Sequence, residues 1–118
     1  MKEEMKLVTQ QAAFARDVSK LIAFIFIEGY GCTFGEAHRT VEQAIIYAHQ
    51  GKGIADSLHC KRLAVDLNLF SPQGDYLQDT KSYEKFGLFW ERLSPRNRWG
   101  GRFKRADGNH FERVELYR

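Results

Sequence analysis

The sequence has few cysteines and no long apolar run. Only two of its 118 residues are cysteines, Cys32 and Cys60, which argues against a framework of disulfide bonds. The longest apolar run, residues 21–27, is far shorter than the roughly 20 residues needed to cross a bilayer. The first residues mix charges and lack the apolar region of a secretory signal peptide. We therefore expect a soluble protein that is made in the cytoplasm and does not insert into membranes.

The sequence also lacks internal repeats and low-complexity linkers. Its 118 residues can enclose one hydrophobic core but leave no room for a separate binding module, so we predict a single domain over residues 1–118. The formal net charge of +3 favours loose attraction to anionic polymers, whether cell wall or nucleic acid. Because no aromatic-basic motif of a known nucleic-acid reader is present, we predict no specific nucleic-acid partner.

The spacing of apolar residues predicts an α+β fold, with an antiparallel sheet and about three helices. Apolar residues recur at helical intervals after Thr9, which is a candidate cap, and Gly29 is a plausible helix stop. Residues 71–79 are polar and indicate a loop. We expect helices over residues 9–28, 40–50 and 81–93, and strands over residues 30–34, 63–70 and 109–117.

The strand expected over residues 63–70 places one candidate functional side chain. Side chains alternate between the two faces of a strand, so the odd-numbered apolar residues face the core and Asp66 faces a cleft on the opposite side. His59 is an odd number of residues away and cannot share that face on one straight strand. We therefore expect His59 on a turn or bulge before the strand.

Four residues form the most informative group: His59, Asp66, Asp107 and His110. Two imidazoles and a carboxylate suit Zn²⁺, and three protein ligands leave a fourth position for water. Asp107 could act as general base on that water. Its ordinary pKa near 3.9 is low for this task; burial should raise the pKa, and proximity to zinc should oppose that rise. Either half of the group alone is weak evidence, since Asp-Gly-Asn is also a common turn sequence.

The residues around this group resemble the zinc peptidases that comprise D-Ala-D-Ala carboxypeptidases and L-alanyl-D-glutamate endopeptidases, especially their small phage endolysin branch. The family pattern S-x-H-x-x-G-x-A-x-D corresponds to Ser57, His59, Ala64 and Asp66. The closing W-G-G…D-x-x-H-F-E corresponds to Trp99, Gly100, Gly101, Asp107, His110, Phe111 and Glu112. An upstream G-E-x-x-R-T-x-E-Q is present as Gly35, Glu36, Arg39, Thr40, Glu42 and Gln43.

The sequence departs from the family pattern at two positions. The glycine of H-x-x-G is Arg62, and the residue after W-G-G, often acidic in the family, is Arg102. The first change could alter the turn between two predicted ligands, because glycine takes backbone angles that arginine resists. The second places a cation near the expected cleft. Neither change removes a predicted ligand.

The resemblance implies a hedgehog or D-Ala-D-Ala-peptidase-like fold with Zn²⁺ in a cleft on the sheet. The ion would be held by His59, Asp66 and His110, with Asp107 as the catalytic base. Glu112, two residues beyond His110, would support a ligand by hydrogen bonding rather than bind the ion. Cys60 could bind metal, but an inert thiol is favoured because the ligand set is complete without it.

Two further residues are candidates for substrate binding. The resemblance places Arg39 in the substrate-binding region, where its guanidinium could hold a carboxylate of a stem peptide. A surface arginine at a helix start is the alternative. Ser57 could contact the substrate or only orient its loop.

The function that the resemblance implies is that of a zinc-dependent peptidoglycan peptidase acting on the L-Ala-D-Glu bond of a stem peptide. A D-Ala-D-Ala carboxypeptidase of the same fold is one alternative, and a non-catalytic zinc-stabilised cell-wall-binding module is another. We expect a monomer. As a phage-type endolysin without a signal peptide, it would reach the wall after holin-type release.

Overall fold

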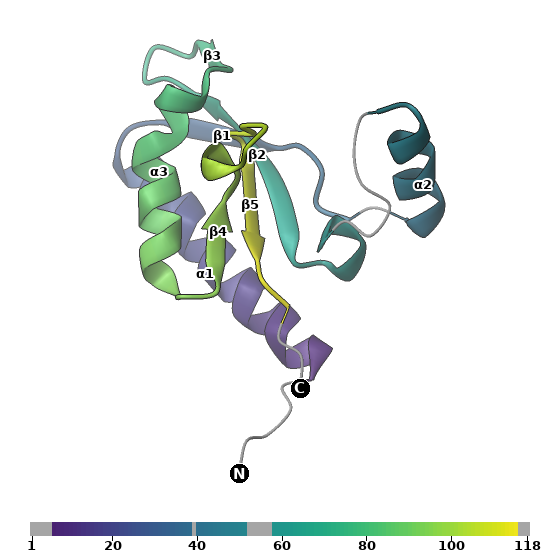
Figure 1. The fold of residues 1–118 in the computed structure, drawn as a ribbon. Helices are drawn as coiled ribbons and strands as arrows, with labels where there is room; N and C mark the ends of the chain where they lie inside the picture. The colour runs from purple at the N-terminus through teal and green to yellow at the C-terminus, as the bar shows by residue number, and fades with distance from the viewer. Residues whose placement is uncertain (1–5, 39, 52–57, 116–118) are drawn as a thin grey trace.

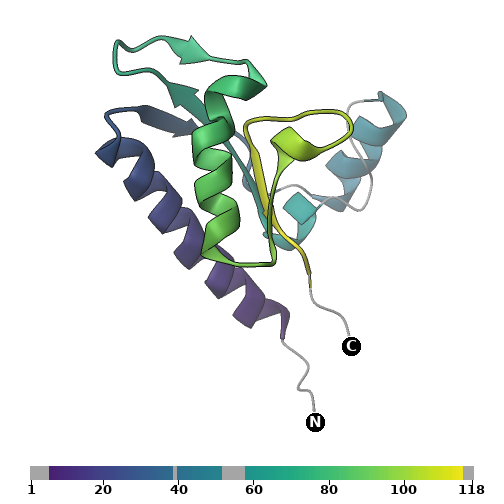
Figure 2. The ribbon, with the colours of Figure 1, turned by 60° about the vertical axis from the view of Figure 1, so that its left-hand side comes forward.

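Two helices pack against one face of a small antiparallel sheet, and a third helix stands apart from this body (Figures 1 and 2). The computed structural model describes residues 6–38, 40–51 and 58–115. The helices are α1 (Leu7–Ile27), α2 (Val41–His49) and α3 (Thr80–Leu93). The strands are β1 (Gly31–Phe34), β2 (Ala64–Phe70), β3 (Tyr76–Leu77), β4 (Asn97–Trp99) and β5 (His110–Arg113). Two short 3₁₀ turns are η1 (Leu58–Lys61) and η2 (Gly100–Arg102). The predicted α+β fold is confirmed.

The sheet has the strand order β1-β2-β5-β4, and β3 pairs with β2. All the pairs are antiparallel. In the pairing of β2 with β5, Asp66 lies opposite His110 and Ala64 lies opposite Glu112. In the pairing of β4 with β5, Arg98 lies opposite Glu112. Strands from distant parts of the sequence therefore bring polar side chains together on one face.

The other face of the sheet carries the hydrophobic core, which lies under α1 and α3. Alternation along β2 works as predicted, because the odd-numbered apolar positions are buried while Asp66 and Asn68 are partly exposed. The buried apolar residues of the core are Phe14, Leu21, Ile25, Leu63, Val65, Leu67, Leu69, Tyr83, Phe86, Trp90, Trp99 and Phe111. Both packed helices cover the core face, so neither covers the face that carries the polar side chains.

Helix α1 ends at the glycine that the sequence indicated. Gly29 adopts a positive φ of 86°, and its N–H donates to the Phe26 carbonyl oxygen at 3.0 Å. The Tyr30 N–H donates to the Ile25 carbonyl oxygen at 3.1 Å, which completes a Schellman motif. Thr9 itself is not the cap, because it lies inside α1; the capping position is the nearby Lys6, without a side-chain hydrogen bond.

Two short strands were missed. The segment 71–79 contains β3, which is fastened by Tyr83 of α3: its hydroxyl group donates to the Leu77 carbonyl oxygen and accepts the Leu69 N–H. Strand β4 has only three residues, and its sequence shows no alternation that would predict a strand. Both strands depend on pairing with distant partners rather than on local pattern. Within the described ranges, no helix is long and apolar enough to span a membrane.

Candidate metal and catalytic centre

His59 lies on the turn that the sequence required. It is in η1, just before β2, and is 2% exposed. The turn closes with a second Schellman pattern, in which the Arg62 N–H donates to the His59 carbonyl oxygen and the Leu63 N–H to the Leu58 carbonyl oxygen. Arg62 has a φ of 56°. The arginine therefore adopts a left-handed backbone angle, which is the kind of angle that glycine adopts most easily.

Asp66 and His110 are cross-strand partners on β2 and β5. The backbone of Asp66 is also fixed from the other side, since its carbonyl oxygen accepts the Gly35 N–H at 2.7 Å and its N–H donates to the Glu36 carbonyl oxygen at 2.7 Å. A Cβ atom at Gly35 would press against the Asp66 side chain. The upstream Gly-Glu pair therefore packs directly behind this carboxylate.

The donor atoms of His59, Asp66 and His110 have the spacing of a metal site. One ligand atom from each lies within 4.8 Å of the others. The Asp66 Oδ1 atom is 3.4 Å from His59 Nε2 and 3.2 Å from His110 Nδ1. Two atoms that each lie about 2.0–2.1 Å from a tetrahedral zinc ion are roughly 3.3 Å apart. The donor set and its spacing therefore fit zinc.

Cys60 points elsewhere, since its Sγ atom lies 3.7 Å from the Thr40 carbonyl oxygen. It is not among the described residues that form this cluster. The other two histidines, His38 and His49, are exposed.

The cluster shifts the pKa values of its own members. Burial alone would raise the pKa of Asp66, but hydrogen bonds and charge interactions with His110 and His59 lower it to about 2. Burial alone would lower the pKa of His110, but hydrogen bonds to Asp66 and Glu112 raise it to about 9. Without a metal ion, a proton on the imidazole therefore balances these carboxylates. A bound cation would take the place of that proton.

Glu112 lies behind His110 rather than beside the metal-facing atoms. Its Oε1 atom is 2.7 Å from His110 Nε2, and the residue is 5% exposed. Its other carboxylate oxygen accepts hydrogen bonds from Arg98, at 2.8 Å from Nε and also from the terminal guanidinium nitrogen. Arg98 and Glu112 thus leave His110 Nδ1 facing Asp66. Arg98 escaped prediction because it reaches this position only through the β4–β5 register.

Asp107 precedes β5 in the loop that leads to His110. Its N–H donates to the Gly100 carbonyl oxygen at 2.9 Å, and its own carbonyl oxygen accepts the His110 N–H at 3.1 Å. Partial burial raises the pKa of its carboxyl group; His110 opposes the rise, and the nearby charge of Asp66 adds to it. The direction is the one expected for a general base. Asp107 also lines a polar pocket of about 200 Å³ with Tyr76, Gln78, Thr80, Tyr83, Ala106, Gly108 and Asn109.

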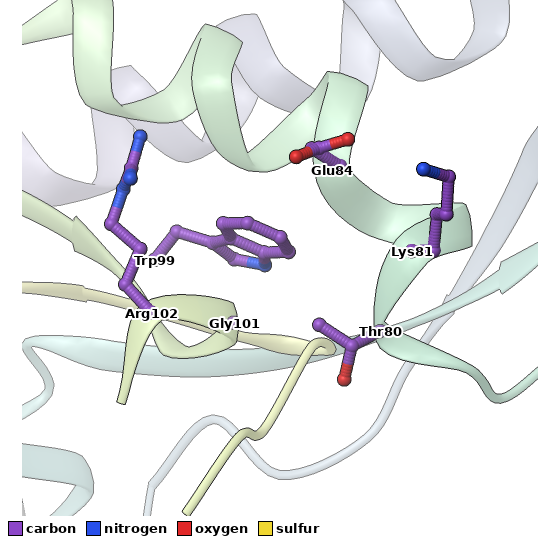
Figure 3. A pocket seen from close by; sticks show the side chains of 6 residues that line it. All are labelled: Thr80, Lys81, Glu84, Trp99, Gly101 and Arg102. Atoms are coloured by element: carbon purple, nitrogen blue, oxygen red, sulfur yellow. The ribbon is translucent and has the colours of Figure 1, made fainter. Parts of the chain in front are cut away.

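A second pocket, of about 590 Å³, shares Thr80 with the first. Figure 3 shows the Trp99 indole in its middle, with Glu84, Lys81 and Thr80 on the α3 side. Arg102, the second departure from the family pattern, also lines it. The Nε atom of Arg102 pairs with both carboxylate oxygens of Glu91, at 2.8 and 2.9 Å. The positive charge of Arg102 is therefore partly balanced by the carboxylate of Glu91 on α3.

Two predicted substrate-binding residues, Arg39 and Ser57, lie outside the described residues. Another residue of the upstream element, Glu36, was not predicted to act at the site. Its Oε1 atom is 3.8 Å from His59 Nδ1, where it can orient the imidazole. The signal that could have found it is its place in the upstream element of the resemblance.

These observations agree with the comparisons to known proteins. The family model described as D-alanyl-D-alanine carboxypeptidase matches residues 50–113, which is more than half of the chain. The chain belongs to this family. The matched range includes all four residues of the predicted metal and catalytic group. No curated protein gives a significant match.

The fold is also similar to that of a solved structure, the Serratia marcescens L-Ala D-Glu endopeptidase ChiX, with a TM-score of 0.71. The two share 20% sequence identity over 86% of this chain and 77% of that chain. At this identity the similarity shows a shared fold, which is the fold that the family membership predicts.

Proposed function

We propose that the protein is a zinc-dependent peptidoglycan peptidase that hydrolyses the L-Ala-D-Glu bond of a stem peptide. The observation that carries the proposal is the His59, Asp66 and His110 cluster, in which the Asp66 carboxylate lies at tetrahedral spacing from a ring nitrogen of each histidine, with Asp107 in the loop beside it. A structural zinc site is closed by four protein ligands, whereas three ligands leave a position open for catalysis. Family membership and the fold of the L-Ala D-Glu endopeptidase support the same class of reaction.

In this proposal each residue has a defined task. His59, Asp66 and His110 hold the ion, which when bound lowers the pKa of a water molecule to about 7 and polarises a carbonyl group. Asp107 accepts the proton of the attacking water and gives it to the leaving amine. Its raised pKa suits both the acceptance and the return of that proton. Glu112 keeps His110 in the orientation that presents Nδ1.

The second candidate is a D-Ala-D-Ala carboxypeptidase, which the description of the matching family model favours. An exopeptidase must bind the terminal carboxylate of the scissile residue, whereas an endopeptidase must leave room beyond it. The 200 Å³ pocket that Asp107 lines offers such room, so we favour the endopeptidase. We also propose that this peptidase acts as a phage-type endolysin.

Digestion of purified peptidoglycan, with and without a chelator, tests the proposal when the products are read by mass spectrometry. Chelator-sensitive release of fragments with a new D-Glu amino terminus is the expected result. Loss of D-Ala alone would instead establish the carboxypeptidase. Absence of cleavage by zinc-loaded protein on several wall types would reject both.

Asp107→Asn tests the general base. We expect a loss of about 10²–10⁴-fold in kcat, because the amide cannot accept the proton, while the protein still binds one zinc ion. Asp75→Asn is the matched control, since Asp75 is an exposed aspartate on the turn before β3 and should keep full activity. Full activity of Asp107→Asn would assign the base elsewhere.

A further inference from the structure

One tryptophan side chain is tied to the loop that carries Asp107. The indole Nε1 of Trp99, on β4, donates to the Gly108 carbonyl oxygen at 2.7 Å. Gly108 directly follows Asp107 and stands two residues before His110. A hydrogen bond from a core side chain therefore helps to hold the backbone between the proposed base and a proposed metal ligand.

The indole ring of Trp99 packs closely against two glycines. A Cβ atom at either Gly87 of α3 or Gly101 of η2 would overlap the Trp99 ring. Trp99 is 5% exposed and belongs to the core. Glycine inside a helix costs about 1 kcal/mol relative to alanine, so Gly87 lowers the intrinsic stability of α3 at the point where the ring needs space. The ring is thus held between a helix and the turn that follows β4 (Figure 3).

The residue after Trp99 packs against the same loop. A Cβ atom at Gly100 would overlap the Asp107 carbonyl oxygen and crowd the His110 Cβ. The Gly100 carbonyl oxygen also accepts the Asp107 N–H. The Trp-Gly-Gly segment therefore meets the Asp107 loop through one side-chain hydrogen bond, one backbone hydrogen bond and one close backbone contact.

We infer that Trp99 is a positioning residue: its indole N–H sets where the Asp107 carboxylate lies relative to the metal-binding cluster. The inference rests on the proposed function, in which Asp107 is the base. A core tryptophan would need only the apolar area of its ring. The donation to Gly108 adds a directional constraint on the loop, and that constraint can be removed without removing the ring.

The chain supplies a matched control in Trp90. It is fully buried in the same core, and its Nε1 also donates to backbone oxygens, at 3.2 Å to Arg98 and 3.1 Å to Glu112. These acceptors lie on β4 and β5 rather than on the Asp107 loop. Loss of the Trp90 donor should therefore affect stability without moving Asp107.

The experiment replaces Trp99 by benzothienylalanine, in which sulfur takes the place of the indole N–H while the ring keeps its shape. We expect kcat of the zinc-loaded enzyme on a stem-peptide substrate to fall about tenfold, because small displacements of catalytic groups are costly. KM should stay within about twofold. Zinc content should not change. Amide hydrogen exchange at Asp107 and His110 should become faster. The same replacement at Trp90 should leave these two amides unchanged and should lower kcat less than the replacement at Trp99 does.

Two results would overturn the inference. One is an unchanged kcat in the Trp99 variant, and the other is an equal loss in both variants, which would indicate a general effect of a weaker core. Trp99→Phe provides a second test, because it should show the same loss of kcat together with a lower Tm. If the unmodified protein cleaves no peptidoglycan, the proposed function fails. The exchange measurement then decides the inference alone, since unchanged Asp107 and His110 amides would show that Trp99 does not hold the loop.

Discussion

Arg62 has a backbone conformation that is unfavourable for any residue with a side chain. Its φ of 56° lies in the left-handed region, which costs a non-glycine residue about 1–2 kcal/mol. Glycine would remove that strain. It would also lower the free energy of unfolding by about 0.5–1 kcal/mol, because glycine makes the unfolded chain more flexible. We expect Arg62→Gly to raise the free energy of unfolding by about 0.5–1 kcal/mol, as measured by urea denaturation.

The control for this prediction is Arg62→Ala, which removes the same exposed side chain and keeps the strained angle. It should not stabilise the protein. An equal gain in both variants would mean that the arginine side chain, and not its backbone angle, is unfavourable. In either case the Schellman hydrogen bonds around His59 should persist, so zinc binding should be unchanged by Arg62→Gly.

Tyr83 joins three elements through one hydroxyl group. From α3 it accepts the buried Leu69 N–H of β2 at 3.0 Å and donates to the Leu77 carbonyl oxygen of β3 at 2.6 Å. Tyr83→Phe would leave the Leu69 N–H buried without this acceptor, at a cost of about 1–3 kcal/mol. We expect urea denaturation to show this decrease in the free energy of unfolding.

Tyr76→Phe is the matched control, because Tyr76 is 49% exposed on β3 and surface changes of this kind stay within about 0.5 kcal/mol. A Tyr83→Phe variant as stable as the Tyr76→Phe control would show that water replaces the lost acceptor. The hydroxyl group would then not be what fastens β3 to the domain.

The longer elements could be predicted because their signals are local. Helices α1 and α3 show apolar spacing with helical periodicity, and β2 shows alternation that also placed Asp66 and required a turn at His59. Strands β3 and β4 have two and three residues, so no periodicity can develop in them. What stabilises them is pairing with β2 and β5, which the sequence does not show.

The same distinction applies to the site. The four residues of the predicted metal and catalytic group could be found because each stands in a short motif. Arg98 could not, because its contact with Glu112 exists only in the register of β4 and β5. The packing site of the Trp99 ring could not be predicted either, because it is formed by Gly87 of α3 and by a turn beyond β4. Local motifs predicted the proposed reacting groups, whereas the residues that contact them depend on tertiary structure.

At the scale of the whole molecule, the stability of the metal-free protein should depend on pH. The raised pKa of His110, about 9 against an ordinary 6.5, gives stability that is fully present below pH 6.5 and is lost as the pH rises through 9. The lowered pKa of Asp66, about 2 against 3.8, gives stability that is present above pH 3.8 and is lost as the pH falls through 2. We expect chelated protein to be most stable between these ranges and to lose on the order of 1–3 kcal/mol between pH 6.5 and 9.

Zinc should remove this loss, because a metal-binding imidazole must be deprotonated and binding releases its proton. The stabilisation by zinc therefore increases as the pH rises from 6.5 to 9, while the chelated protein weakens. Urea denaturation at several pH values gives the free energy of unfolding of the zinc-bound and chelated forms. The difference between the two forms should grow as the pH rises, so the two curves should diverge. His110→Gln should remove most of the divergence, and the exposed His49→Gln should leave it intact. Parallel curves for the unmodified protein would mean that the metal does not replace the His110 proton, and that this cluster is not the zinc site.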